Sequence, residues 1–181
     1  MNMKELGTFK VNTHEIKASD PCYSVGPWCQ GVLKPVVKGD WRAFAEYGVG
    51  GSAEGRVALL RIVHEAASPH IECDETADFE VGVDSGTAGF WDIIAYRNRQ
   101  LLEDKFKNGA DDDHWFNMCH TIYGEGRDDS LAYVGPFGVH SSSGYGDGSY
   151  QCKFARNAQG LIVAAEIDFF QRELDEDSDE E

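Results

Sequence analysis

Apolar and polar residues alternate with a period of two in two stretches near the C-terminal end of the chain. Tyr150, Cys152 and Phe154 share one face of the first stretch. After Asn-Ala-Gln-Gly at 157–160, the apolar positions of the second stretch are Leu161, Val163, Ala165, Ile167 and Phe169. Two such stretches, joined by a short turn that ends in glycine, predict an antiparallel β-hairpin.

Two apolar runs earlier in the chain also have the length of strands. One is RVALLRIVH at 56–64, and the other is FEVGVD at 79–84, which Ser85 and Gly86 bring to an end. Short apolar runs bounded by turn residues are typical of strands. The first half of the chain is therefore predicted to form strands rather than helices.

One segment has a helical pattern. Its apolar residues at helical spacing are Trp115, Met118, Cys119, Ile122 and Tyr123. Asp112 or Asp113 is placed to cap the N-terminus of this helix, and Gly124 is placed to end it. A weaker pattern predicts a second helix over 97–107.

These elements predict an α+β fold, with mainly an antiparallel β-sheet or sandwich and one or two short helices. A chain of 181 residues has the length of one domain. We expect a single β-rich domain over 1–172. The acidic segment 173–181 holds one apolar residue, Leu174, and is predicted to be a disordered tail.

The formal net charge is −16, and seven of the acidic residues lie in 173–181, which leaves −9 on residues 1–172. Such a charge excludes a nucleic-acid binder that neutralises phosphates, because this class needs a basic face. It also disfavours docking on anionic lipid. The charge instead favours a basic protein as partner.

The five cysteines are an odd number and are widely spaced, at positions 22, 29, 73, 119 and 152. This pattern argues against the disulfide framework of a secreted protein. The N-terminal stretch does not resemble a signal peptide, and no window of the sequence is apolar enough to cross a membrane. We therefore expect a cytoplasmic protein, with its cysteines acting as small buried apolar residues.

Two glycine-containing loops are candidate ligand sites. Small residues in such loops allow backbone N–H groups to face a ligand, although neither loop has the lysine of a phosphate-binding loop. Turn geometry alone also accounts for them. The candidate ligand-binding residues are Asp84, Ser85, Gly86, Gly144, Tyr145, Gly146, Asp147 and Gly148.

Catalytic and metal signatures are incomplete. No CxxC or HxxxH pair favours structural zinc, and no Gly-x-Ser-x-Gly motif frames a nucleophilic serine, so no catalytic residue is assigned. We predict no cofactor, and keep a divalent cation as an alternative. Its candidate ligands are carboxylates near turns: Asp84, Asp92, Asp147 and Asp168.

Several of these segments, in this order, resemble one known family. They are Ala18-Ser19-Asp20-Pro21, Arg56-Val57-Ala58, Val83-Asp84-Ser85-Gly86 with Asp92, the stretch 142–150, and Asn157, Gly160 and Asp168. Over residues 7 to 170 the chain is similar to the bacterial and phage proteins grouped as domain-of-unknown-function family 4241. The resemblance implies a β-rich domain of phage or bacterial origin, and it transfers no activity.

The leading hypothesis is a non-enzymatic binding or accessory domain that interacts with another protein, such as a basic host protein. One alternative is a metal-dependent hydrolase or transferase that uses the four aspartates, since carboxylates can act as metal ligands or as acid and base. A second alternative is a structural virion component. The sequence leaves the oligomeric state open.

Overall fold

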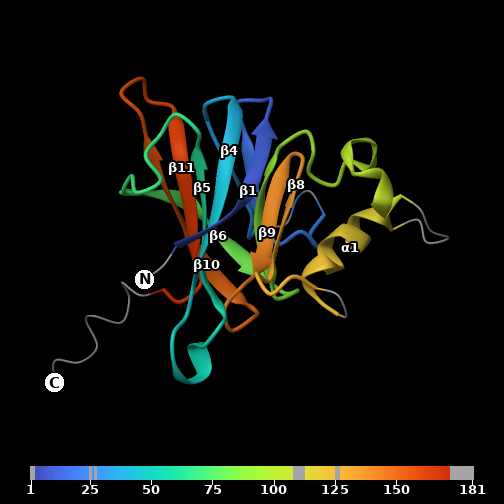
Figure 1. Cartoon of the computed structure of the whole chain (residues 1–181). Coiled ribbons are helices and arrows are strands. Elements are labelled where there is room, and N and C mark those ends of the chain that lie inside the picture. Colours follow the sequence, from blue (N-terminus) through green and yellow to red (C-terminus); the bar gives the residue numbers. More distant parts are fainter. Residues whose placement is uncertain (1–2, 25, 27, 108–112, 125–126, 172–181) are drawn as a thin grey trace, which may run out of the picture.

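The computed structural model describes residues 3–24, 26, 28–107, 113–124 and 127–171. Within them the strands form two sheets that pack face to face as a sandwich (Figure 1). The six-stranded sheet has the order β1 (Met3–Val11), β4 (Gly39–Tyr47), β5 (Val57–His64), β11 (Ile162–Asp168), β10 (Gly148–Arg156) and β6 (Glu75–Val83). The five-stranded sheet has the order β3 (Gly31–Leu33), β2 (Ile16–Ser19), β7 (Thr87–Asp92), β9 (Gly138–Ser142) and β8 (Ala132–Gly135).

The strand ladders are antiparallel in both sheets, which confirms the predicted fold class. The main core lies between the sheets. Trp41, Leu60, Ile62 and Ile167 enter it from the six-stranded sheet, and Phe90 enters it from β7. Each of these side chains is fully buried, and burial of apolar area of this size is the main stabilising contribution to such a fold.

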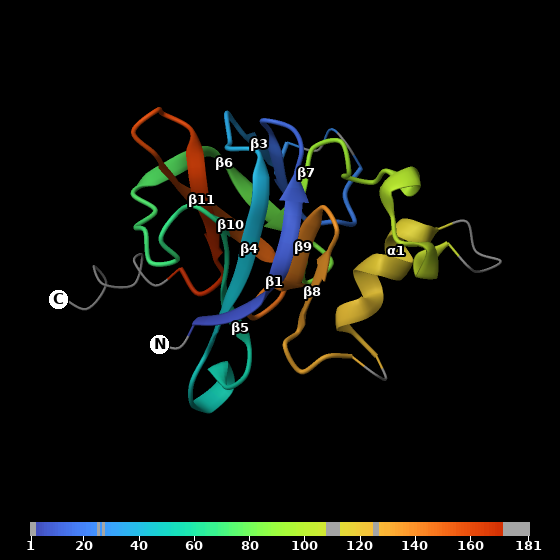
Figure 2. The ribbon, with the colours of Figure 1, turned by 45° about the horizontal axis from the view of Figure 1, so that its top comes forward.

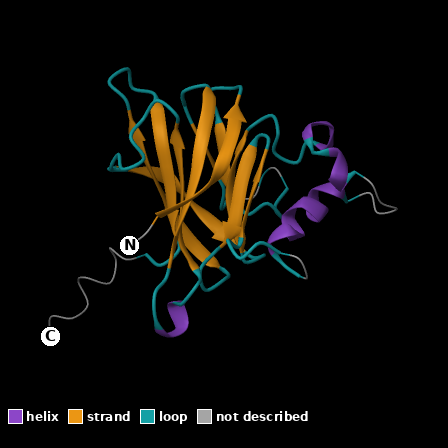
Figure 3. Ribbon diagram, in the orientation of Figure 1, coloured by secondary structure: helices purple, strands orange, loops and turns teal. Residues whose placement is uncertain are grey.

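A helical layer covers the outer face of the five-stranded sheet, on one side of the sandwich (Figure 2; Figure 3). It contains the 3₁₀ turns η2 (Arg99–Leu101) and η3 (Asp104–Phe106), helix α1 (His114–Cys119) and η4 (His120–Ile122). A further 3₁₀ turn, η1 (Gly51–Ala53), lies between β4 and β5. A second apolar cluster joins this layer to Trp91 of β7 and includes Tyr96, Phe106 and Trp115. Strand β7 is buried along its whole length because it is covered on both faces.

The outer face of the six-stranded sheet holds a third, smaller apolar cluster below the loop that joins β5 to β6. Arg61 and Glu166 form a nearly buried ion pair there, with 2.5 Å between Nη1 and Oε2. Arg61 also donates to the carbonyl of Ile71 in the covering loop. Burial raises the pKa of Glu166, although the guanidinium of Arg61 opposes this effect.

The predicted hairpin is confirmed as β10 and β11, and Gly160 has the positive φ of 79° that its turn requires. The strand register differs at the start of β11. The ladder shifts between Ala155 and Arg156, so that Ile162 rather than Leu161 packs in the main core, and Val163 packs in the smaller cluster on the outer face. The other predicted strands are confirmed as β5 and β6, although β6 begins at Glu75.

The helix is confirmed as α1, and Asp113 caps it by accepting a hydrogen bond from the Phe116 N–H. It ends at Cys119 rather than at Gly124, because the chain continues as the 3₁₀ turn η4 and is extended at Tyr123. The second predicted helix, over 97–107, is wrong. Its residues form η2 and η3, separated by Leu102 in an extended conformation. Leu102 and Phe106 both pack in the apolar cluster below α1.

None of the described helices is long and apolar enough to cross a membrane. The five cysteines all lie in the described part of the chain, and none of them forms a disulfide. The acidic segment 173–181 and two residues of the Asp111–Asp113 run, Asp111 and Asp112, lie outside the described residues.

Candidate functional site

Asp20 follows β2 directly and is completely buried. Its Oδ2 accepts the backbone N–H groups of Asp84 (2.9 Å) and Ser85 (2.8 Å), in the turn between β6 and β7. Its Oδ1 accepts the Cys22 N–H (2.8 Å) and the Ser85 hydroxyl (2.7 Å). Hydrogen bonds to a carboxylate are stronger than neutral ones, so Asp20 holds two loops in one fixed arrangement.

The turn held by Asp20 also contacts the loop between β9 and β10. The Gly86 N–H donates to Oδ1 of Asp147 (3.1 Å), and the Ser143 N–H donates to the Gly86 carbonyl (3.0 Å). Gly86 has a φ of 68°, a conformation that favours glycine. Tyr123 also contacts this turn, because its hydroxyl donates to the Gly86 carbonyl at 2.9 Å. Two segments that the sequence singled out separately therefore meet in space.

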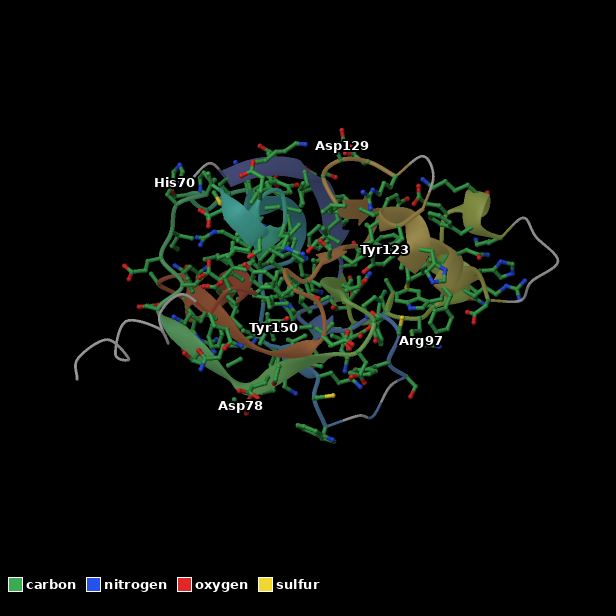
Figure 4. All side chains as sticks on the ribbon, turned by 90° about the horizontal axis from the view of Figure 1, so that it is seen from below. His70, Asp78, Arg97, Tyr123, Asp129 and Tyr150 are labelled. Atoms are coloured by element: carbon green, nitrogen blue, oxygen red, sulfur yellow. The ribbon has the colours of Figure 1, made fainter. Side chains whose placement is uncertain are left out.

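We call this group the loop-end site. It comprises Asp20, Cys22, Tyr23, Asp84, Ser85, Gly86, Tyr123 and Asp147. Figure 4 views the molecule from this end, with Tyr123 and Tyr150 towards the middle and with His70 and Asp78 towards the margin. Tyr150 lies below the β9–β10 loop and donates to the Gly146 carbonyl at 2.7 Å.

Two carboxylates of the site face solvent. Asp84 accepts a hydrogen bond from the Tyr23 hydroxyl, with 2.6 Å between Oη and Oδ2. Burial, together with the hydrogen bond to Asp84, raises the pKa of Tyr23, which therefore stays protonated as the donor. Asp147 is exposed on the neighbouring loop. Both carboxylates are fixed by their hydrogen bonds and remain accessible.

The β9–β10 loop divides at Gly144 and Tyr145. Tyr145 is 59% exposed and turns away from Gly86 towards η1. Its ring stacks on Phe170 with 5.2 Å between ring centroids, and the Arg56 guanidinium lies 5.0 Å from its centroid. The predicted ligand loop therefore has two sides: 146–148 adjoins the 84–86 turn, and Gly144 and Tyr145 adjoin β5 and β11.

The four candidate metal ligands lie in three places. Asp84 and Asp147 flank the loop-end turn. Asp92 lies at the opposite end of β2 and accepts from the N–H groups of Asn12 and Thr13. Asp168 accepts from the N–H groups of the turn after β11. In the part of the chain that the structure describes, no three His, Cys, Asp or Glu side chains form a group that could hold a metal ion.

The link between the loop after β2 and α1 has no signal in the sequence. The indole of Trp115 in α1 donates to the Pro21 carbonyl at 2.7 Å. Cys119, the last residue of α1, lowers the pKa of the partly exposed Cys22 thiol to about 7. No spacing rule relates positions this far apart along the chain. Asp20 was also missed as a site residue, although an acid between a strand and Pro21 marks a turn.

The family model described as a protein of unknown function (DUF4241) matches residues 9–167. The chain belongs to this family. The match spans both sheets and every segment of the loop-end site, so the DUF4241 region and the folded core coincide. Neither the search of curated proteins nor the search of solved structures found a match.

Proposed function

We propose that this DUF4241 protein is a non-enzymatic binding module that recognises a basic segment of another protein through the loop-end site. The observation that carries the proposal is the role of Asp20. This buried carboxylate uses its own acceptors on three backbone N–H groups and one hydroxyl, and thereby fixes the exposed Asp84 and its neighbours. A surface that is rigid before binding loses little conformational entropy on binding.

The charge of the site suits a partner rich in Lys or Arg. Asp84 and Asp147 are both exposed and project from loops that contact each other through Gly86. Residues 1–172 carry a net −9, which attracts a basic segment at long range and speeds its association. The same charge opposes binding to nucleic acid or anionic lipid.

Exposed aromatic rings of the site and of its adjoining segments supply contact area. Tyr123 is 39% exposed within the site, and Tyr145 is 59% exposed on the adjoining loop. Trp28 is 88% exposed, in a segment that returns to β6 through a hydrogen bond from the Gly82 N–H to the Cys29 carbonyl. Tyr and Trp are enriched among residues that dominate protein–protein interfaces.

A titration with a Lys/Arg-rich peptide, followed by tryptophan fluorescence and calorimetry, tests the proposal. In the double variant Asp84→Asn/Asp147→Asn, loss of two charge contacts should weaken binding about fivefold to tenfold. The matched control is Glu65→Gln/Glu72→Gln, which removes the same charge from exposed positions outside the site. It should change the affinity less than twofold.

Two outcomes contradict the proposal. Equal weakening in both double variants means that the peptide senses only net charge. Absence of binding to the unmodified chain rejects a basic partner altogether. The proposal places the partner in the cytoplasm, and the bacterial or phage origin implied by the family resemblance makes a host protein the natural source of the basic segment. Fractionation of cells that express the chain tests the location.

A further inference from the structure

Strand β6 is an edge strand of the six-stranded sheet: it pairs with β10 on one side, and among the described residues no strand pairs with it on the other. Backbone N–H and C=O groups of successive residues point to opposite edges of a strand. The Gly82 N–H points to the outer edge, because it donates to the Cys29 carbonyl at 2.8 Å. The N–H and C=O groups of Glu80, two residues earlier, therefore also point outwards. An unpaired edge of this kind is a template for another strand.

The side chains of β6 alternate between two environments with a period of two. Thr76, Asp78 and Glu80 are exposed on the outer face of the sheet. Ala77 and Phe79 point the other way, are half-buried and pack against the main core. A strand added beside β6 therefore has one set of side chains next to the acids and the other set next to Phe79.

A groove of about 330 Å³ lies between β6 and β3, where the two sheets each end in an edge strand. Two cations line it, and both are already paired, Lys34 with Glu15 and Arg156 with Glu75. The rest of its lining is mostly apolar. These apolar lining residues are Val32, Leu33, Ala77, Phe79, Phe154 and Ile162. The inward-facing side chains of an added strand enter this groove, which suits apolar residues.

The outward-facing side of the β6 edge is acidic. Asp78 lies at the margin of the molecule in Figure 4, and in the part of the chain that the structure describes its carboxylate has no hydrogen-bond or ion-pair partner. Glu80 accepts the Ser149 hydroxyl at 2.6 Å and remains exposed. Opposite charges on neighbouring strands attract, and like charges directly opposite each other are destabilising. Two copies of β6 therefore repel each other, whereas a strand that carries Lys or Arg is attracted.

We propose that the β6 edge at 75–80 binds an extended segment of another protein by strand addition, and that this segment alternates apolar residues with Lys or Arg. Its apolar side chains enter the groove beside Phe79, and its basic side chains lie next to Asp78 and Glu80. In this mode main-chain hydrogen bonds supply affinity, and side chains at alternate positions supply specificity. Because Cys29 occupies the edge at Gly82, this surface ends before the loop-end site, and the inference does not depend on the proposed function.

The probe that tests this inference is a capped peptide in which Val and Lys alternate, added to the full chain at pH 7. Calorimetry measures its affinity, and NMR measures hydrogen exchange of the Glu80 amide. The Glu80 N–H should exchange about fivefold more slowly in the complex, because it gains an acceptor. A second peptide of the same composition, with all Lys residues before all Val residues, keeps the charge without the alternation and should bind about fivefold more weakly.

Two N-methylated peptides separate strand pairing from charge. Methylation at every Val removes the N–H groups of one edge of the alternating peptide, and methylation at every Lys removes those of the other edge. Only one edge of the peptide faces β6. One of the two peptides should therefore lose about tenfold in affinity, and the other should bind within about twofold of the unmethylated peptide.

Matched variants of the protein test the charge complementarity. Asp78→Lys/Glu80→Lys places like charges beside the basic residues of the alternating peptide and should weaken its binding about tenfold. The control Glu65→Lys/Asp129→Lys makes the same change of charge at exposed positions outside β6 and its groove. It acts only through the long-range field and should weaken binding about twofold.

Four results would overturn the inference: equal affinity of the two N-methylated peptides, equal affinity of the peptide without alternation, equal weakening by the two charge-reversed variants, or a dimer of the free chain that pairs two β6 strands. The N-methylated peptides act on the unmodified chain, so they decide the question if Glu80→Lys fails to fold. In Asp84→Asn/Asp147→Asn the alternating peptide should keep its affinity within about twofold. A larger loss there would assign its binding to the loop-end site instead.

Discussion

A buried aspartate lies at each end of strand β2, and both aspartates accept hydrogen bonds from neighbouring loops. Asp20 follows β2 and holds the turn after β6. Asp92 pairs with Ile16 at the start of β2, and it holds the loop after β1 through the N–H groups of Asn12 (2.5 Å) and Thr13 (3.2 Å). Both aspartates are completely buried and accept mainly backbone N–H groups.

The two ends differ in what surrounds the buried carboxylate. Around Asp92, the bonded groups belong to one short loop and to Ile94, and they complete the fold locally. Around Asp20, three loops and Tyr123 meet, with exposed acids and aromatic rings. Each buried aspartate thus has a structural role, and we expect function to reside in the groups that it positions.

The largest expected effect is on stability, and it should be equal at the two ends. Asp20→Ala and Asp92→Ala each leave several buried N–H groups without acceptors, so each should lower the unfolding free energy by about 4 kcal/mol. Urea denaturation measures this. The milder Asp20→Asn and Asp92→Asn should cost about 2 kcal/mol, and only the first should weaken binding of the basic peptide. Equal losses of peptide affinity would erase the functional distinction between the two ends.

Buried His140 differs from the two buried aspartates in how many hydrogen bonds it makes. Nε2 lies 3.5 Å from Oγ1 of Thr121, and Nδ1 has no partner among the described residues. Burial lowers the pKa of His140 to about 4. The unfolded chain, with a histidine pKa near 6.5, therefore binds a proton that the native state does not.

The contribution of neutral His140 to the unfolding free energy is therefore complete above about pH 6.5. It is lost as the pH falls to about 4, a change of about 3 kcal/mol. The unfolding free energy should fall with acid less steeply in His140→Phe, which keeps a ring stacked on Trp91. Denaturant titrations at several pH values measure both slopes. Identical slopes would show that His140 has the same pKa in the native state as in the unfolded chain.

Removal of a single hydroxyl group compares the two ends of β2 with a smaller loss of stability. Thr13→Val removes a 2.8 Å hydrogen bond to Asp92 and should cost about 1 kcal/mol, because the acceptor stays buried. Tyr23→Phe removes the bond to Asp84 at the exposed end and should cost about 0.5 kcal/mol. Thermal denaturation ranks the two. A reversed order would mean that the loop-end site depends on Tyr23 for its stability.

The smallest stability effect belongs to the exposed acids. Asp84→Asn/Asp147→Asn should change the unfolding free energy by less than about 1 kcal/mol, because surface substitutions are usually close to neutral. The same variant should show the largest loss of basic-peptide affinity. A large loss of stability here would place these acids with Asp20 and Asp92, as structural groups.

Local chemistry determined the elements that the sequence predicts correctly. The alternation through β10 and β11, the glycine-ended turn between them and the cap at Asp113 each depend on neighbouring residues, so each is readable without the fold. The segment 97–107 was predicted wrongly because a short, weak helical pattern supplies little stability of its own, and the extended backbone at Leu102 and Glu103 divides it into two 3₁₀ turns. The register of Ile162 depends likewise on a bulge that no local pattern specifies.

The sequence by itself determined that this protein has a β-rich fold, an acidic surface and glycine-dependent loops of aspartates. Only the tertiary structure decided which of those aspartates come together. Asp84 and Asp147 meet because β6, β7, β9 and β10 bring their turns to one end, whereas Asp92 and Asp168 lie elsewhere. Sheet order and the packing of α1 likewise bring Trp115 to the Pro21 carbonyl, since contacts between distant segments arise from burial of shared apolar faces rather than from spacing along the chain.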